Sequence, residues 1–358
     1  MKIKRLGALA AILAISAGVS TSALAVPTFN PFVTTSNLNT ALGNSAAIGF
    51  AYAGNKFVGS VYSGLNNNQL YQTDLTGGSV TLFGASIPGA SGEIYVTSSL
   101  GLGGFGARDV FAGSENVGTV FRFNNDGTGQ VALTSGLVGG VRGIAFDPYG
   151  LYGNNMIVTT RSGNVYKINS AGTPSLLANV GEDAEGLSFA PQAFGPYPKG
   201  TLVVASEGSG NLRAISPAGA ITYVANVSSA EMVSFVPLNL GASGNPLEGF
   251  YAANYALNVV KAPASDFLAY VGDLIVTGEG THLLSDVKWN GASFVSSLIG
   301  TFPNQPEDGT FVTADILNLG CSATHTCGGS VPEPATLALF GVALASLTFV
   351  RRRSRKLS

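Results

Sequence analysis

The sequence predicts an all-β fold, a β-propeller of about six four-stranded blades, and three observations support this prediction. The 358 residues include 48 glycines, and only 11% of the residues are charged. Short apolar runs alternate with turns rich in Gly, Asn and Pro, and no segment keeps a helical periodicity. The chain is also similar to itself at intervals of about 45 residues, which is the spacing of propeller blades.

The repeat is clearest in three segments that end alike and start 43 and 46 residues apart. These segments are 143–148 (GIAFDP), 186–191 (GLSFAP) and 232–237 (MVSFVP). An apolar strand follows each of them, then an alternating strand, a small-residue turn and a fourth strand. The apolar strands are expected at 110–114, 156–160, 202–206, 250–253 and 274–278. Their lengths and the Gly, Asn and Pro turns fit four antiparallel strands per blade.

The limits of the propeller are placed at residues 56 and 316, after a lead-in segment at 26–55 that could hold an edge strand. Between 254 and 273 the repeat is compressed, which indicates that one blade is short or incomplete. Phe311 and Val312 are interpreted as an extra inner strand that helps to close the ring. A β-solenoid and a two-sheet sandwich are the alternatives to this fold.

The first 25 residues have the three parts of a secretory signal peptide. Lys2, Lys4 and Arg5 form a basic start, residues 6–19 are apolar, and 23–25 (ALA) offers a cleavage site. No cysteine lies near that site, which argues against lipoprotein processing. The sequence therefore predicts an exported protein.

The last 28 residues also have three parts in a fixed order. Val331, Pro332, Glu333 and Pro334 precede an uncharged apolar run at 335–350, and a basic cluster follows that begins with Arg351, Arg352 and Arg353. This order resembles the PEP-CTERM sorting signal of Gram-negative bacteria. The resemblance implies a precursor held at the inner membrane, cleavage by an exosortase, and transfer to the cell surface or extracellular matrix. A plain C-terminal membrane anchor is the alternative.

The charge of the exported body argues against a nucleic-acid partner. Residues 1–25 hold three of the 18 basic residues, and residues 331–358 hold five of them and one of the 20 acids. Residues 26–330 therefore keep 10 basic and 19 acidic residues, a net charge of −9. Nucleic-acid binding needs clustered Lys and Arg to neutralise phosphates.

The only two cysteines, Cys321 and Cys327, lie in a linker at 317–330 before the sorting signal. In an oxidising compartment such a pair is expected to form a disulfide. Two alternatives stay open at this point: free thiols, or a metal site that includes His325.

Charged residues recur at equivalent positions of the repeat and define a candidate ligand face. In a four-stranded blade, the loop that enters the inner strand and the turn between the second and third strands lie on the same face. The first position holds residues four places before the phenylalanines at 146, 189, 235 and 311, namely Arg142, Glu185, Glu231 and Glu307. The second position holds Glu115, Arg161, Glu207, Glu279 and His282.

These carboxylates predict a binding site at the mouth of the channel. Oxygen ligands suit hard cations, so Glu185, Glu231 and Glu307 are the expected ligands of a Ca²⁺ ion, and a polyhydroxylated ligand is also compatible. The alternative is that these residues only cap turns and keep the sheet ends soluble. No other cofactor is indicated.

The leading functional hypothesis is a non-catalytic surface or matrix propeller that binds a polysaccharide, a partner protein or an ion. Neither a GxSxG nor an HExxH motif occurs, and no catalytic residue is assigned. In its spacing alone, the body resembles NHL-like and gluconolactonase-like six-bladed propellers, and the gluconolactonase-like hydrolases use a metal in the channel. A metal-dependent extracellular hydrolase or lactonase is therefore the alternative. In that enzyme, Glu279 and His282 could together act as the general base.

Overall fold

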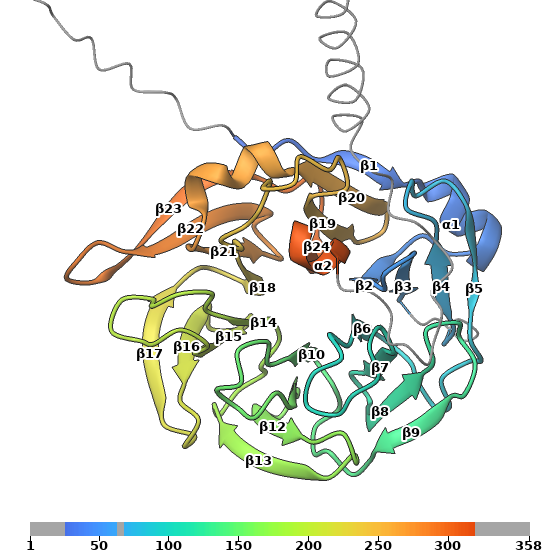
Figure 1. Ribbon diagram of the computed structural model, residues 1–358, viewed down its shortest axis with the longest axis horizontal. Coiled ribbons are helices and arrows are strands. Elements are labelled where there is room, and N and C mark those ends of the chain that lie inside the picture. The colour runs from blue at the N-terminus through green and yellow to red at the C-terminus, as the bar shows by residue number, and fades with distance from the viewer. Residues whose placement is uncertain (1–25, 63–67, 319–358) are drawn as a thin grey trace, which may run out of the picture.

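The computed structural model describes residues 26–62 and 68–318, which form a ring of six four-stranded antiparallel sheets (Figure 1). This arrangement confirms the predicted β-propeller and rules out the solenoid and the sandwich. The signal peptide at 1–25, the cysteine pair and the sorting signal at 331–358 lie outside the described residues. Within the described part of the chain, no helix is long and apolar enough to cross a membrane.

Four blades are built from consecutive strands, inner strand first. The first blade contains β2 (Ala47–Tyr52), β3 (Phe57–Val61), β4 (Leu70–Thr73) and β5 (Val80–Phe83). The second contains β6 (Ile94–Ser98), β7 (Val110–Ser114), β8 (Val117–Phe123) and β9 (Val131–Thr134). The third contains β10 (Gly143–Phe146), β11 (Met156–Thr159), β12 (Asn164–Ile168) and β13 (Pro174–Asn179). The fourth contains β14 (Leu187–Phe189), β15 (Leu202–Ser206), β16 (Asn211–Ile215) and β17 (Ile221–Asn226).

The last two blades are interlocked, because the chain leaves the fifth blade after one strand and returns to it later. The fifth sheet has the order β18 (Ala230–Phe235), β21 (Leu274–Gly278), β22 (Leu283–Trp289) and β23 (Phe294–Thr301). The sixth has the order β24 (Pro306–Val312), β19 (Gly249–Asn254), β20 (Asn258–Pro263) and β1 (Asn30–Val33). A 3-10 helix, η1 (Ala264–Tyr270), leads from β20 back to β21. The N-terminal strand thus closes the ring by completing the last blade.

The structure differs from the sequence expectations in this region. The strand expected at 250–253 does not pair with the strand at 232–235 but belongs to β19 of the next blade. The compressed repeat is therefore a hairpin placed in the sixth blade, not an incomplete blade. The expected lead-in holds two propeller strands, β1 and β2, so the boundary at residue 56 was too late. Phe311 and Val312 belong to β24, the inner strand of the closing blade.

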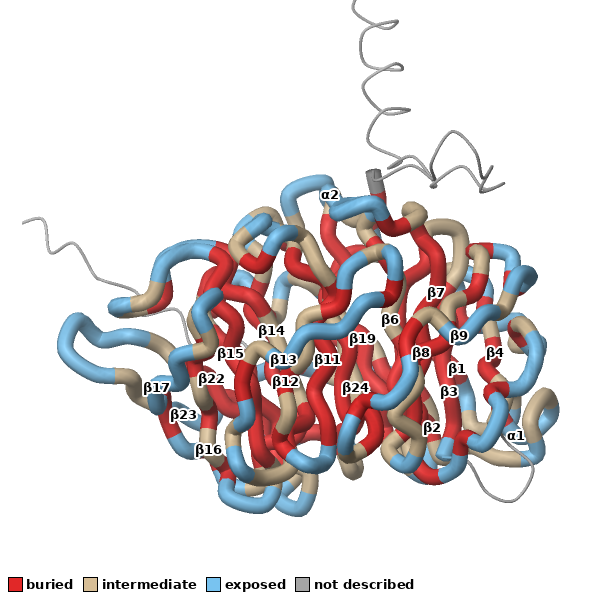
Figure 2. The backbone as a smooth tube through the Cα atoms, turned by 90° about the horizontal axis from the view of Figure 1, so that it is seen from below, coloured by how far each residue is buried: buried red, intermediate tan, exposed pale blue. Residues whose placement is uncertain are grey.

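The core consists of six apolar clusters, and each lies between two neighbouring blades. Where the sixth blade meets the first, the ring of Phe57 lies 4.6 Å from that of Tyr251 and 5.0 Å from that of Phe50. Burying a side chain of this size stabilises the fold by about 1.5–3 kcal/mol. Figure 2 shows buried strands between exposed turns at the two faces of the ring.

Glycines lie where two of the inner strands begin, Gly143 as the first residue of β10 and Gly186 directly before β14, because neighbouring inner strands approach closely there. A Cβ atom at Gly186 would lie 2.3 Å from the carbonyl oxygen of Glu231, and one at Gly143 would lie 2.6 Å from that of Glu185. The Gly186 N–H donates to the Glu231 carbonyl at 3.0 Å. These contacts fix the backbone of both glutamates at the start of the channel.

The short helix α2 (Ala314–Asn318) follows β24 directly and lies over one end of the central channel (Figures 1 and 2). Its Ile316 lines the channel cavity. The Ala314 N–H donates to Oε1 of buried Glu248 at 2.9 Å, and Arg108 donates from Nη2 to the Ile316 carbonyl. A second helix, α1 (Thr35–Leu42), connects β1 to β2 and is capped by Thr34. We call the channel end near α2 the α2 face and the opposite end, where inner strands begin, the acidic face.

Candidate functional site

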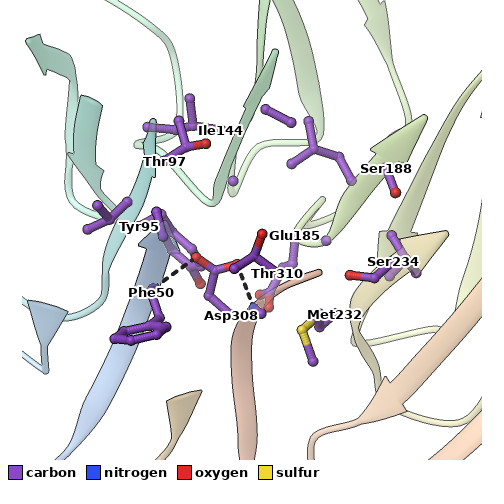
Figure 3. Close-up of a pocket in the computed structure, with 18 of the residues that line it drawn as sticks. Phe50, Tyr95, Thr97, Ile144, Glu185, Ser188, Met232, Ser234, Asp308 and Thr310 are labelled. Atoms are coloured by element: carbon purple, nitrogen blue, oxygen red, sulfur yellow. Dashed lines mark hydrogen bonds between the residues drawn. The ribbon is translucent and has the colours of Figure 1, made fainter. Parts of the chain in front are cut away.

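A central cavity of about 280 Å³ runs along the propeller axis and opens among charged residues of the acidic face. Arg142, Glu185, Glu231 and Glu307, all predicted from the repeat, line it. Figure 3 shows that side chains of several inner strands point into this cavity. The repeat register therefore located four residues of one mouth.

Arg142 is the principal positive charge of this mouth. Its guanidinium lies 2.8 Å from Oε1 of Glu185, 2.9 Å from Oδ2 of Asp183 and 3.4 Å from Oε2 of Glu115, and it also pairs with Glu93. Burial alone would lower the pKa of Arg142, but the acidic groups around it raise the pKa above its ordinary value. This arginine therefore neutralises one sector, between the second and fourth blades.

Two members of that sector, Glu93 and Tyr95, were missed by the sequence analysis. The Tyr95 hydroxyl donates to Oε2 of Glu93 at 2.7 Å, and Arg142 donates to the Tyr95 oxygen at 3.2 Å. Glu93 stands directly before inner strand β6, at the same blade position as Glu185. The register could have revealed it, but the fourth residue after it is Thr97 and not the phenylalanine that marks the other blades.

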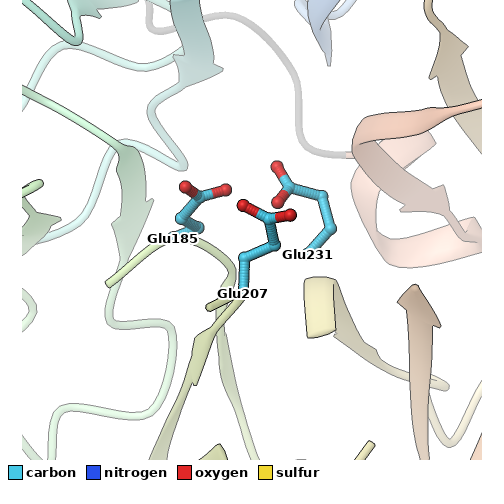
Figure 4. A group of neighbouring side chains, drawn as sticks. All are labelled: Glu185, Glu207 and Glu231. Carbon is cyan, nitrogen blue, oxygen red and sulfur yellow. The ribbon is translucent and has the colours of Figure 1, made fainter. Parts of the chain in front are cut away.

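The densest group of carboxylates is formed by Glu185, Glu207 and Glu231. One carboxylate oxygen of each lies within 4.8 Å of the others, and Figure 4 shows the three side chains pointing toward one another. Glu185 and Glu231 are 2% and 4% exposed, whereas Glu207 is half-buried in the turn between β15 and β16. Among the described residues, this is the cluster whose donor atoms converge as metal ligands do.

Two oxygens of this cluster lack a hydrogen-bond donor. Oε2 of Glu231 and Oε1 of Glu185 are buried and accept no hydrogen bond from an N–H or O–H group in the described structure. Oε1 of Glu185 does lie 2.8 Å from Arg142, without the alignment of a hydrogen bond, but Glu231 has no ion pair there. Buried carboxylate oxygens are normally bonded or paired, so Oε2 of Glu231 is an oxygen at which a proton, a water molecule or a cation could serve as partner.

The electrostatics of the cluster agree with this reading. Burial raises the pKa of Glu185 to about 7, although a proton shared with Glu231 and the charge of Arg142 act in the opposite direction. Burial also raises the pKa of Glu231, and the charges of Glu185 and Glu307 add to that effect. The three carboxylates can therefore approach only when a proton or a cation separates their charges.

Glu307, the third ligand expected from the sequence, lies beside Glu279 and is not among the three carboxylates whose oxygens lie within 4.8 Å of one another. Gln305 donates from Nε2 to Oε1 of Glu307 at 2.8 Å and to Glu279. Burial raises the pKa of Glu279 to about 8, with a hydrogen bond to Glu207 adding to it, and burial likewise raises the pKa of Glu307. The third carboxylate that converges with Glu185 and Glu231 is Glu207, because its turn brings it beside Glu185.

The remaining predicted residues lie on the acidic face but at its edge. The Arg161 side chain is 62% exposed and lies 3.7 Å from Glu115. His282 occupies the β21–β22 turn with a φ of 57°. In the described structure Glu279 accepts a hydrogen bond from Gln305, and no hydrogen bond joins Glu279 to His282. The two side chains therefore do not form the hydrogen-bonded pair suggested as a general base.

Deeper in the cavity lies Asp308, which the sequence analysis did not select. Its Oδ2 accepts from the Phe50 N–H at 3.3 Å and its Oδ1 from the Gly309 N–H at 2.8 Å. Burial raises the pKa of Asp308 to about 7. Hydroxyl groups of Ser188, Ser234 and Thr310 line the cavity near it, so the interior is partly polar.

Comparison with solved structures shows the fold alone. A chain of a nidogen/laminin complex aligns with 74% of this chain and 85% of its own, at 14% identity and a TM-score of 0.50. A streptogramin B lyase aligns with 80% of this chain and 92% of its own, at 11% identity and a TM-score of 0.45. A putative gluconolactonase aligns with 79% and 94%, at 11% identity and a TM-score of 0.44.

Sequence comparison is informative at the C-terminus. No curated protein matches the chain. Residues 330–355 match the PEP-CTERM protein-sorting motif, in agreement with the tripartite order of the tail. The chain is therefore a β-propeller that carries a PEP-CTERM sorting signal, which implies export and processing of a membrane-held precursor by an exosortase.

Proposed function

We propose that this protein is a surface- or matrix-associated binding propeller whose acidic mouth holds a divalent cation, Ca²⁺ in the first place, on Glu185, Glu207 and Glu231. The observation that supports it best is the buried, donor-free Oε2 of Glu231 inside a group of three converging carboxylates. The cation would join the face to an extracellular polysaccharide or surface protein.

Calcium is preferred over other cations because of the ligand type and number. All three side chains offer oxygen, which hard cations prefer over the softer metals that select sulfur or nitrogen. Ca²⁺ takes about 6–8 oxygen ligands in flexible geometry, whereas Mg²⁺ requires a near-ideal octahedron. Three carboxylates leave positions open for water or for oxygen atoms of an external ligand.

The same cluster supports a second candidate, a metal-dependent hydrolase or lactonase. A bound cation can polarise a carbonyl and lower the pKa of a bound water. In that case Glu185 and the other two carboxylates would hold the metal, and the acidic groups around them would orient the bound water. The binding role is preferred because neither a GxSxG nor an HExxH motif occurs, and because no hydrogen bond joins Glu279 to His282 in the described structure.

Calorimetric titration of the chelator-treated protein with calcium tests the proposed site. We expect one site on the wild type, loss of the heat in Glu231→Gln, and an unchanged titration in Asp126→Asn. Asp126 is the matched control because it is an exposed carboxylate of the opposite face, bonded to Thr128. Absence of calcium binding to the wild type would refute the site. Hydrolysis of sugar lactones that depends on added metal and on Glu185 would favour the second candidate.

The sorting step has its own test in the native host. Replacing Pro332, Glu333 and Pro334 with Ala should leave the protein at the inner membrane, whereas surface-associated wild type should lack Arg351–Arg353. Intact-mass analysis of the released protein decides this. Released material that keeps the three arginines would contradict processing at the tail.

A further inference from the structure

The two faces of the propeller differ in their relation to the sorting tail. Each inner strand begins at the acidic face and ends at the α2 face, and the described chain ends in α2 after β24. The sorting motif follows at residues 330–355. The tail therefore departs from the centre of the face opposite the acidic mouth, as the position of α2 in Figure 2 shows.

The connecting segment is long enough to bring either face to the membrane, but only the acidic face would require it to be largely extended. Sixteen residues, 319–334, separate α2 from the apolar run, and they span at most about 58 Å whatever their conformation. To place the acidic face on the membrane, they would have to pass around the blades. That path is at least about 40 Å, because β24 is about 23 Å long and the four strands of a blade add about 15 Å. With the α2 face down, no such detour is needed.

The charge distribution favours the same orientation. The acidic face carries Arg142, Arg161 and Arg213 against nine carboxylates, which are Glu93, Glu115, Glu182, Asp183, Glu185, Glu207, Glu231, Glu279 and Glu307. The turns of the α2 face carry charges of both signs, with Asp74, Asp126 and Asp315 exposed beside Lys56 and Lys199. A bilayer that contains anionic lipids repels the first face more than the second.

The α2 face also presents side chains suited to a lipid head-group layer. Leu238 and Leu268 are 50% and 52% exposed, and the Lys199 ammonium lies 4.7 Å from the centre of the Tyr149 ring. Lys and Tyr combine an apolar body with a polar tip and are frequent at membrane interfaces. Apolar side chains such as Leu283 are exposed on the acidic face too, so charge and tail position decide between the faces.

We propose that the α2 face is the membrane-contacting surface of the tail-held precursor and that its occupant is the phospholipid head-group layer. The acidic mouth then points away from the membrane while the protein awaits exosortase. This orientation leaves the channel mouth open to solvent, because α2 lies over the membrane-side end.

The single tryptophan, Trp289, offers a direct test. It ends β22 at the α2 face, is 36% exposed, and packs on Phe294 with ring centroids 5.0 Å apart. The chain with its sorting tail is reconstituted into vesicles of phosphatidylethanolamine and phosphatidylglycerol that contain a head-group nitroxide lipid. Tyr62→Trp in a Trp289→Phe background reports the acidic face, since Tyr62 is 38% exposed at the end of β3.

We expect nitroxide quenching to be several times stronger at Trp289 than at the acidic-face tryptophan. Leu238→Asp with Leu268→Asp should weaken the quenching of Trp289, whereas Leu283→Asp, a matched exposed leucine of the other face, should not. Equal quenching of both reporters, stronger quenching at the acidic face, or no quenching of either would overturn the proposal. Differential quenching that appears only after exosortase is added would show that the enzyme and not lipid is the occupant, and would overturn it as well.

Discussion

The two ends of the channel each bury a carboxylate, and the two carboxylates differ in what surrounds them. At the α2 face, Asp147 is fully buried and accepts four backbone hydrogen bonds, from Tyr149, Gly150, Tyr152 and Asn154, at 2.7–3.0 Å. At the acidic face, Glu231 is 4% exposed, and its Oε2 accepts none in the described structure. The first side chain organises a turn, whereas the second lies among other carboxylates.

A second buried acid of the α2 face shows the same contrast with Glu231. Glu248, also at the α2 face, resembles Asp147, because Ser243 and Ala314 donate to both of its oxygens. Burial raises the pKa of Glu231, and the charges of its neighbours Glu185 and Glu307 add to that effect. Buried polar atoms without a partner are uncommon in folded proteins, so the Glu231 oxygen is a candidate for binding.

The largest change in stability is expected at Asp147 on the α2 face, whose carboxylate is fully hydrogen-bonded. Asp147→Ala would leave four N–H groups without their acceptor, that of Tyr152 buried and the other three partly buried, so we expect the free energy of unfolding to fall by about 2–3 kcal/mol. Urea denaturation measures this loss, with Asp126→Asn as the control of nearly wild-type stability. A small effect of Asp147→Ala would show that water replaces the carboxylate, and the contrast between the two ends would be weakened.

The second prediction is that a substitution of Glu231, unlike that of Asp147, increases the free energy of unfolding. In chelator, Glu231→Gln should raise the free energy of unfolding by about 1 kcal/mol, since it removes a buried charge from a repelling group. Calcium at a hundredfold excess over Kd should stabilise the wild type by about 2.7 kcal/mol and the variant not at all. Thermal melts with calcium and with chelator check both effects. Equal calcium stabilisation of variant and wild type would place the ion elsewhere.

The third prediction is a pH dependence in the absence of cations. Burial raises the pKa of Glu185 to about 7, above the value of about 4.3 of an exposed glutamate. In this window the folded state binds more protons than the unfolded state, so stability is full below about pH 4.3 and is lost as the pH rises through about 7. We expect a loss of about 2 kcal/mol between pH 5 and pH 8 in chelator.

Calcium provides the control for that experiment. The bound ion favours the ionised carboxylates, so saturating calcium should remove most of the decline with pH. Urea denaturation at several pH values, with and without calcium, measures both curves. A free energy of unfolding that rises with pH in chelator would contradict the raised pKa values.

Much of this geometry could be predicted from the sequence because it repeats locally. The phenylalanines at 146, 189, 235 and 311 set a register, and that register located Arg142, Glu185 and Glu231 at one mouth. The register did not identify Glu93, because its blade lacks the phenylalanine. The exchange of strands between the last two blades was not predicted for another reason. The sequence of β19 is like that of any other strand, and only long-range pairing decides whether β18 or β24 lies beside it.

The ligand set could not be predicted from the register alone. Glu185, Glu231 and Glu307 share a position in the repeat, but the repeat does not say which side chains meet across the channel. The turn that carries Glu207 brings a second carboxylate from the same blade as Glu185, and this contact depends on side-chain direction. The repeat register therefore predicts on which face these residues lie, whereas side-chain packing determines which of them come into contact.

The smallest expected effect distinguishes the two possible third ligands. Glu207→Gln should weaken calcium binding about tenfold, equivalent to about 1.4 kcal/mol, because it removes one of three converging donors. Glu307→Gln should change affinity by less than about 0.5 kcal/mol, since Gln305 holds Glu307 away from the cluster and only its distant charge is lost. Calorimetric titration of both variants at one ionic strength compares them directly. The opposite ranking would restore Glu307 as the ligand and show that the carboxylates rearrange around the ion.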